Sequence, residues 1–176
     1  MSKDQMIGLV ATHLRLLQRA ADAFDEAVAA ALGINRTDLR ALDLLLGNDT
    51  PVSAGELSDA LRLSPAATTT VIDRLQRAGL ADRIPDPHNR RRVLVAATNT
   101  ARDAENRIYA PVGVAGSEAL GRYTHEQLAT IVDFLRVARR VQEEQASRLA
   151  GTEARQPAPG SRLRRAGSDG GPGLAV

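Results

Sequence analysis

Three consecutive threonines stand near the start of a segment whose residue types favour contact with duplex DNA. Ser64 can cap a helix and Pro65 suits its first position, so residues 64–77 are predicted to form a helix. Small hydroxyl and methyl groups near a helix N-terminus can approach base edges in the major groove, and the N-terminal amides suit a phosphate. The candidate reading residues are Ser64, Pro65, Ala66, Thr68, Thr69 and Thr70. A semi-buried helix face that tolerates threonine is the alternative interpretation.

Basic residues cluster around the same segment. Between residues 71 and 92 there are six arginines and three aspartates. Arg74 lies in the predicted helix and is expected to anchor a DNA phosphate, whereas Arg90 and Arg91 are expected at the tip of a hairpin, where one could enter a minor groove. A run of charge is usually a solvated face. Its place beside a candidate reading helix favours the DNA interpretation.

Enzymatic chemistry finds no support in the residue types. The three histidines, His13, His88 and His125, are scattered, and no histidine-glutamate metal motif, nucleophile-elbow motif or phosphate-binding glycine loop is present. The sequence contains no cysteine, which excludes thiol catalysis and cysteine-ligated zinc. We therefore predict that the chain is not an enzyme and has no catalytic residues, no metal site and no cofactor.

Short helices precede the threonine segment. Residues 35–46 are predicted to form a helix that ends at Gly47. Ser53 and Glu56 form a capping box that opens a second helix, which ends near residue 61. Residues 62 and 63 then form a tight turn before the helix of the threonines. A short turn between two capped helices is the spacing of a helix-turn-helix.

A hairpin is predicted directly after the helix-turn-helix. Two β-prone runs, residues 80–84 and 92–97, flank a turn rich in Pro, Asp and Asn at residues 85–91. A hairpin in this position predicts a winged helix. Thr98 can cap the next helix, which is expected to reach about residue 120.

Apolar residues recur at heptad spacing near both ends of the chain, in residues 6–32 and in residues 124–150. The stripe positions are Ile7, Val10, Leu14, Leu17, Ala21, Phe24, Val28, Leu128, Ile131, Leu135, Ala138 and Val141. Thr124 and Gln127 form a capping box at the start of the second segment. Such helices either pack together within one subunit or pair across a dimer. In the helix that follows Thr98, the helix-breaking residues Pro111, Gly113 and Gly116 are expected to cause a kink or a split.

Composition bounds the fold class and the domain organisation. With two Phe, two Tyr and no Trp, the core must be built from aliphatic residues, which suits packed helices. The formal net charge is +2, equal to the excess of the last 26 residues, so any DNA interface must rest on local charge. No membrane span or signal peptide is recognised, and we expect a cytoplasmic protein.

We predict a mainly α protein with a winged helix-turn-helix, a small β-hairpin wing and long terminal dimerisation helices. Its predicted parts are an N-terminal dimerisation helix (1–34), a DNA-binding domain (35–98), C-terminal dimerisation helices (99–150) and a disordered tail rich in Arg, Gly and Pro (151–176).

The sequence resembles the MarR-type winged-helix transcription regulators. Residues 63–75 are similar to the family's recognition helix, and residues 78–80, 86–91 and 93–98 are similar to its wing signature. His88 and Asn89 stand where the family has Arg and Asp, and Ala97 and Ala101 stand where it has Leu and Gly. Elements in the family's order run from about residue 5 to residue 148.

The resemblance implies a homodimer that binds a pseudo-palindromic DNA operator and is released by a small, often aromatic or phenolic, effector. It also implies a wing-tip DNA contact at Arg91 and at Arg90. The ligand is unknown; His13, Arg15, Arg40 and Tyr109 could line its site, although a solvent-facing role is the simpler interpretation. We predict a sequence-specific DNA-binding transcriptional regulator, a repressor. The alternative function is a winged-helix module for protein contact, such as an antirepressor or partner subunit.

Overall fold

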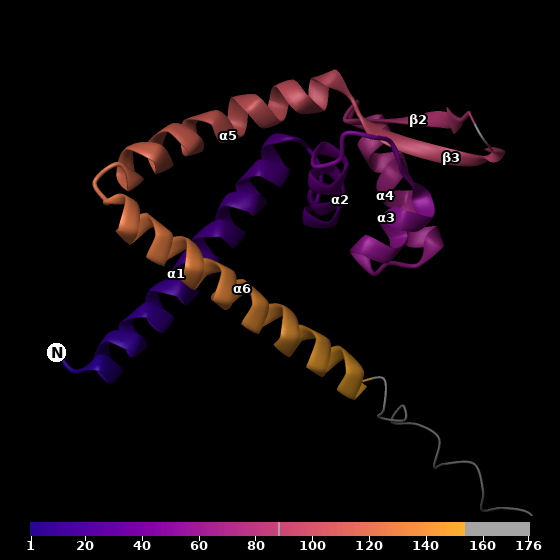
Figure 1. The fold of residues 1–176 in the computed structure, drawn as a ribbon. Helices are drawn as coiled ribbons and strands as arrows, with labels where there is room; N and C mark the ends of the chain where they lie inside the picture. The colour runs from indigo at the N-terminus through magenta and orange to yellow at the C-terminus, as the bar shows by residue number, and fades with distance from the viewer. Residues whose placement is uncertain (88, 154–176) are drawn as a thin grey trace, which may run out of the picture. The chain divides into compact units, whose positions relative to one another are not determined.

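A computed structural model describes residues 1–87 and 89–153 of the chain. Six helices and three strands make up the described residues, in the order α1-α2-β1-α3-α4-β2-β3-α5-α6 (Figure 1). The chain divides into two compact units, Met1–Ser117 and a second that begins at Glu118. The mainly helical fold class is confirmed.

Four helices of the first unit begin at side-chain caps. They are α1 (Lys3–Ala31), α2 (Arg36–Leu46), α3 (Ala54–Leu61) and α4 (Pro65–Arg77), capped by Ser2, Asn35, Ser53 and Ser64. Each cap oxygen accepts a hydrogen bond from a backbone N–H of the first turn, which would otherwise have no partner inside the helix. The predicted helix-turn-helix is therefore confirmed, with α3 and α4 as its two helices.

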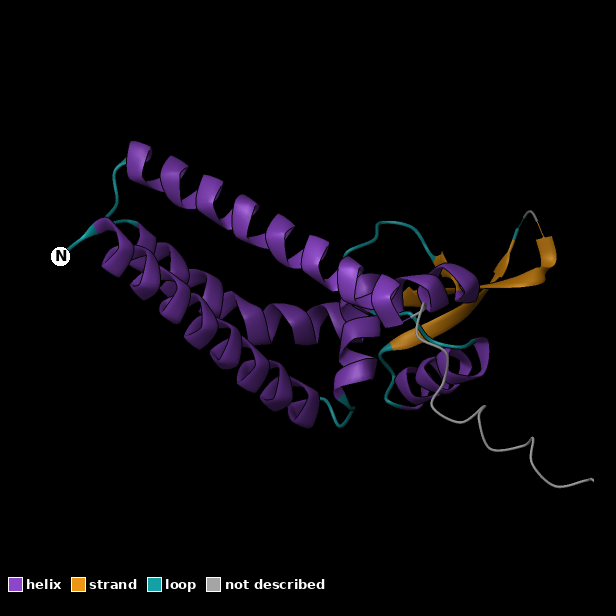
Figure 2. Ribbon diagram, turned by 90° about the horizontal axis from the view of Figure 1, so that it is seen from below, coloured by secondary structure: helices purple, strands orange, loops and turns teal. Residues whose placement is uncertain are grey.

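The wing belongs to a three-stranded antiparallel sheet in the order β1-β3-β2. Figure 2 shows the strands in orange. Its strands are β1 (Val52–Ser53), β2 (Ala81–Asp86) and β3 (Asn89–Ala97). The sequence predicted two strands, and the short strand β1 was missed because two residues carry no alternation that could reveal them. β1 is recognisable only by its pairing, in which Val52 faces Val95.

The hairpin turn is shorter than the predicted turn at residues 85–91. Pro85 and Asp86 belong to β2, and Arg90 and Arg91 belong to β3. Proline is tolerated there because β2 is an edge strand, and the pairing register shifts between Pro85 and Asp86. The two arginines therefore lie in a strand next to the turn, which corrects their predicted place within it.

Aliphatic side chains of α2, α3, α4, the sheet, the turn after α4 and the start of α5 (Asn99–Leu120) form one core. Its buried members are Ala41, Leu42, Leu45, Leu57, Leu61, Val71, Ile72, Leu75, Leu80, Ala81, Val95 and Ala101. A smaller cluster joins α1 to α2 through Val28, Ala29 and Leu39, and Ile108 and Tyr109 of α5 pack against it. The winged helix is thus closed by its own apolar residues, and α1 and α5 are attached to it.

Two long helices complete the described residues. Helix α5 is capped by Thr98, as predicted, and continues through Pro111, so the expected split is wrong. A helix of 22 residues keeps its other hydrogen bonds when one donor is lost. Helix α6 (His125–Glu153) begins at the predicted capping box of Thr124 and Gln127. It includes residues 151–153, which corrects the start of the predicted tail, and the rest of that tail lies outside the described residues. None of the described helices is long and apolar enough to cross a membrane.

Candidate nucleic-acid interface

The N-terminal half of α4 presents an exposed face of small side chains. Its exposed members are Ser64, Pro65, Ala66, Thr69 and Thr70. Thr68, in contrast, is only 1% exposed, so its expected place on this face is wrong. Thr68 precedes Val71, Ile72 and Leu75 by three, four and seven residues, which is the spacing of the buried stripe itself. The helical periodicity therefore contained the signal that Thr68 faces the core.

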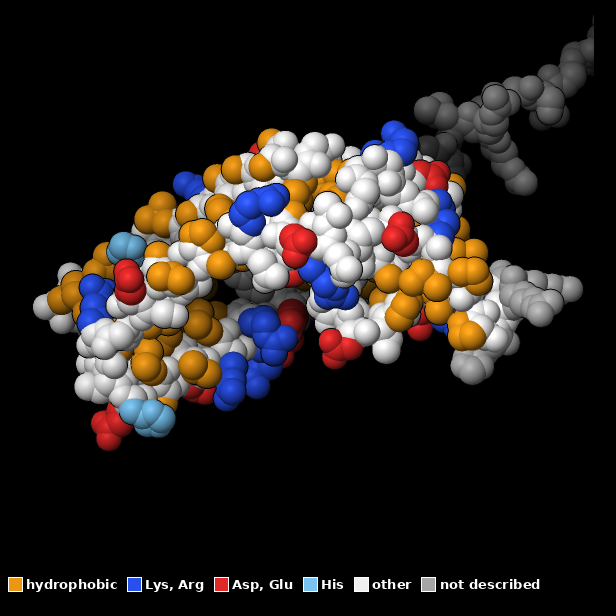
Figure 3. Space-filling view, turned by 90° about the horizontal axis from the view of Figure 1, so that it is seen from above, with side chains coloured by type: hydrophobic (Ala, Val, Ile, Leu, Met, Phe, Trp, Pro, Cys, Tyr) orange, Lys and Arg blue, Asp and Glu red, His pale blue; other side chains and the backbone are white. Residues whose placement is uncertain are grey.

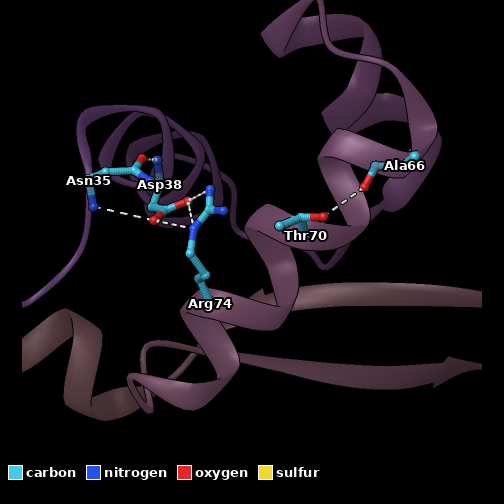
Figure 4. Close-up of polar contacts among 5 residues, drawn as sticks. All are labelled: Asn35, Asp38, Ala66, Thr70 and Arg74. Atoms are coloured by element: carbon cyan, nitrogen blue, oxygen red, sulfur yellow. Dashed lines mark hydrogen bonds and ion pairs between the residues drawn. The ribbon is translucent and has the colours of Figure 1, made fainter.

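The three threonine hydroxyls donate hydrogen bonds back to the helix. Thr68, Thr69 and Thr70 donate from Oγ1 to the carbonyl oxygens of Ser64, Pro65 and Ala66, at 3.1, 3.0 and 3.1 Å. Figure 4 shows this contact for Thr70. Because each hydroxyl hydrogen is engaged, the oxygens of the exposed residues Thr69 and Thr70 can act only as acceptors toward a further group.

Arg74 turns away from this face and pairs with a buried carboxylate. Its Nε donates to both oxygens of Asp38, at 3.0 and 2.8 Å, and its Nη2 donates to Oδ1 at 2.6 Å (Figure 4). These bonds raise the pKa of the Arg74 guanidinium. Asp38 is 0% exposed, so its charge depends on this partner. The side chain thus fixes α4 to α2, and its expected contact with a DNA phosphate stays a prediction.

Asp38 also belongs to the cap of α2. The Asn35 side chain accepts from the Asp38 N–H at 3.0 Å, and the Asn35 N–H donates to Asp38 Oδ2 at 3.3 Å. The next residue, Arg36, donates to Asp22 of α1 at 2.5 Å, a contact that raises the pKa of Arg36. The start of α2 therefore connects α1 on one side with α4 on the other.

Two wing arginines hold the hairpin against the helices. Arg83 of β2 contacts Gln76 and pairs with Asp73 of α4 at 2.6 Å. Arg92 of β3 pairs with Glu56 of α3 at 3.1 Å. Hydrogen bonds from Ser53 and the charge of Arg92 lower the pKa of Glu56. Two of the six arginines between residues 71 and 92 thus orient the wing.

Arg90 and Arg91 are adjacent in β3, and their side chains lie outside what the structure describes. Their predicted DNA contacts stay predictions, as do those of Ser64, Pro65, Ala66, Thr69 and Thr70. Sequence reasoning missed the pairing of Arg74 with Asp38, which are 36 residues apart. No local pattern signals a contact at that separation.

A group of acidic side chains lies where α1, α2 and α5 meet. Desolvation raises the pKa of Asp43, and the carboxylates of Asp25 and Glu105 raise it further. Burial and the same three carboxylates raise the pKa of Tyr109, whose ring meets Phe24 edge to face at 5.6 Å. Among the described residues, no group of His, Asp and Glu is arranged to hold a metal ion.

Comparison with known proteins decides the family. A family model described as the MarR family matches residues 32–92, which span α2 to the first half of β3. The uncharacterized HTH-type transcriptional regulator YcgE of Bacillus subtilis is 34% identical over 126 residues, which cover 72% of this chain and 81% of YcgE. The chain belongs to the MarR family of transcriptional regulators. The expectation that it is not an enzyme is confirmed by this membership.

Solved structures share the fold of this MarR-family chain. RV1404 from Mycobacterium tuberculosis has a TM-score of 0.61 at 26% identity, over 80% of this chain and 94% of RV1404. A single-residue variant of MepR from S. aureus, bound to an oligodeoxyribonucleotide, has a TM-score of 0.54 at 13% identity, over 76% and 97% of the two chains. These likenesses confirm the winged-helix architecture of the MarR-family chain.

Proposed function

We propose that this MarR-family regulator represses transcription by binding a pseudo-palindromic site in double-stranded DNA as a homodimer, with α4 in the major groove. The observation that carries the proposal is the exposed face of Ser64, Pro65, Ala66, Thr69 and Thr70 at the N-terminal half of α4. Small side chains let the helix backbone approach the base edges closely. Likeness in fold to a DNA-bound MepR variant adds support.

The chemistry of the face points to a class of base contact. With their hydroxyl hydrogens bonded to the helix, Thr69 and Thr70 offer acceptor oxygens and methyl groups. Acceptors match the amino groups of adenine N6 and cytosine N4, and methyl groups match the thymine methyl. We expect Thr69 and Thr70 to contact such groups, and Ala66 to contact a thymine methyl.

The wing supplies contacts of a different kind. Arg90 and Arg91 follow the turn of a hairpin that Arg83 and Arg92 hold against α4 and α3. An arginine at the wing would enter the minor groove or meet the phosphates beside it, where groove width and potential matter more than base identity. Arg91→Ala should therefore weaken binding to all duplexes alike and reduce the salt slope by about one.

Homodimer formation is supported by the apolar side chains of the long helices. On α1, Ile7 is 57% and Leu17 is 60% exposed, and on α6, Leu135 is 47% and Val141 is 48% exposed. Apolar stripes left open at heptad spacing are the surfaces through which helices pair. We assign residues 1–34 and 99–150 to dimerisation and residues 35–98 to DNA binding. Two half-sites should then lie about 10 base pairs apart.

A small aromatic or phenolic effector completes the proposal. The edge-to-face pair of Phe24 and Tyr109 between α1 and α5 could stack such a ring, while His13, Arg15 and Arg40 are exposed. We favour repression over activation, because a protein bound to an operator blocks RNA polymerase without any contact with the polymerase. Release by the effector would then relieve repression.

Selection of genomic fragments followed by a salt titration tests the proposal. We expect the protein to select a pseudo-palindrome and its affinity for that duplex to fall steeply as salt rises, because binding releases counterions. Footprinting should protect two half-sites. A protein that selects no DNA at any salt concentration would instead be the module for protein contact, whose apolar interface is insensitive to salt.

A further inference from the structure

Arg62 ends α3 in a left-handed backbone conformation, with φ 56 and ψ 44. Within the described part of the chain it is the one residue other than glycine with a positive φ. The left-handed positions just after α1 and α4 are held by Gly33 and Gly79. A Cβ atom raises the free energy of this conformation, whereas glycine adopts it freely. The backbone alone would therefore favour glycine at position 62.

The turn around Arg62 is held by three hydrogen bonds. The N–H of Arg62 donates to the Asp59 carbonyl at 3.2 Å, and the N–H of Leu63 donates to the Ser58 carbonyl at 3.0 Å. The Ser58 hydroxyl donates to the Leu63 carbonyl at 2.7 Å. Leu63 also packs against the core. These contacts fix the backbone from which the Arg62 side chain projects.

The Arg62 side chain is exposed, and its guanidinium has no hydrogen bond or ion pair with residues 1–87 or 89–153. In this respect it differs from Arg74, Arg83 and Arg92, which pair with carboxylates. Two residues later, Ser64 begins α4 and the exposed face of small side chains. An unpaired cation thus stands on a rigid turn next to the face that we propose reads DNA.

We propose that Arg62 binds a phosphate of the DNA backbone at the edge of the groove that α4 enters. This inference rests on the proposed function and adds an anchoring residue to it. A guanidinium binds phosphate through parallel N–H donors, and a phosphate contact fixes the register of the reading helix without carrying sequence information. A rigid turn loses little backbone freedom on binding. The contact accounts for an arginine where the fold favours glycine.

The competing account is that Arg62 acts only on the helix that it ends. A positive side chain near a helix C-terminus interacts favourably with the helix dipole. That role stabilises the folded state and is independent of DNA. Binding and stability measurements on the same variants therefore separate the two accounts.

Arg62→Gly removes the charge and leaves a residue suited to the backbone, and Arg62→Asn is a second neutral variant because asparagine tolerates this conformation. Arg62→Lys keeps the charge. Arg19→Ala is the matched control, because it removes an exposed arginine of α1 that lies outside the apolar stripe of that helix. The probe is a random-sequence duplex, because a phosphate contact is independent of base sequence. Affinity is measured across a salt series, and melting temperature is measured on the same samples.

We expect Arg62→Gly and Arg62→Asn to lower the salt slope by about 0.9 for each lost phosphate contact, which is about a fivefold loss of affinity per contact at about 0.15 M salt. Arg62→Lys and Arg19→Ala should keep the wild-type slope, and Arg62→Gly should melt no lower than wild type. An unchanged slope in both neutral variants would overturn the inference and leave Arg62 as a helix-dipole residue. Wild-type protein that binds no duplex at low salt would overturn the proposed function together with it.

Discussion

The winged helix buries many of its apolar side chains, whereas the long helices expose most of theirs. Every buried hydrophobic residue among those described lies between Val28 and Ala104, and the core of the winged helix joins α2, α3, α4 and the sheet. Helix α6 contains no buried residue within its described part, and the first 23 residues contain none either. Figure 3 shows hydrophobic side chains exposed among charged ones on the face that it presents. One region completes its core alone, whereas the other leaves apolar side chains exposed.

The ion pairs of the winged helix also differ from the ion pair on α6. In the winged helix, three arginines are structural partners: Arg74 pairs with buried Asp38, and Arg83 and Arg92 hold the hairpin. On α6, Arg139 pairs with Glu143, four residues further along an exposed surface. Ion pairs of this second kind contribute about 0.3–0.5 kcal/mol. Substitutions in the two regions should therefore differ in size and in dependence on protein concentration.

The largest effect is expected where the winged helix buries a charge. Arg74→Ala leaves the Asp38 carboxylate buried without its partner, which should cost about 3–5 kcal/mol of unfolding free energy, measured by urea denaturation. The double variant Asp38→Leu with Arg74→Met should recover most of this loss, because a buried ion pair can be replaced by apolar residues of similar volume at little cost in stability. A cost below about 1 kcal/mol for Arg74→Ala would mean that Asp38 reaches water. The ion pair of the winged helix would then be no stronger than the exposed pair on α6.

The second prediction concerns the association of two copies of the chain, and not the folding of the winged helix. Leu17→Ser on α1 should weaken the proposed dimer by about 3 kcal/mol, counting both copies of a largely exposed leucine that the partner would cover. Sedimentation over a range of protein concentrations measures this change, and circular dichroism should show an intact winged helix. Ile84→Ser removes an exposed apolar residue from the wing as the control and should leave the mass unchanged. Wild type that sediments as a monomer would refute the assignment of α1 to dimerisation.

Thr68 and Thr69 offer a matched comparison within α4. Thr69→Val removes an exposed hydroxyl and should cost about 1–3 kcal/mol of binding to the selected operator, with little effect on random DNA. Thr68→Val removes a buried hydroxyl and should change folding stability by about 1 kcal/mol, with no loss of base discrimination. If Thr68→Val altered the preferred sequence and Thr69→Val did not, the proposed reading face would be wrong.

The smallest effect concerns the acidic group at the junction of α1, α2 and α5. Because the pKa of Asp43 is raised in the folded state, its protonation favours folding, and that contribution is lost as the pH rises through the raised value. Asp43→Asn should therefore stabilise the protein at pH 7 by up to about 0.5 kcal/mol, since the group stays open to solvent. The gain should vanish below about pH 4, where the carboxyl is protonated in both states. A gain that is constant with pH would contradict this cause.

Local sequence determined the helices and their boundaries. Asn35, Ser53 and Ser64 cap the helices at the predicted places, because a cap depends on residues within one turn of each other. The hairpin after α4 and the continuity of the terminal stripes also follow from neighbouring residues. Because these features are local, the order of amino acids by itself is enough to recognise a MarR-type fold.

Tertiary packing decided which of the predicted site residues face solvent. Arg74 and Thr68 both lie on the predicted reading helix, yet Arg74 meets a carboxylate 36 residues away and Thr68 enters the core. The pairing of β1 with β3 and the bonds of Arg83 and Arg92 are contacts of the same kind. A charge excess along the chain cannot reveal which arginines are neutralised, because their partners come from other helices. The sequence thus indicated where the proposed interface lies, and the folded arrangement decided which side chains are left to form it.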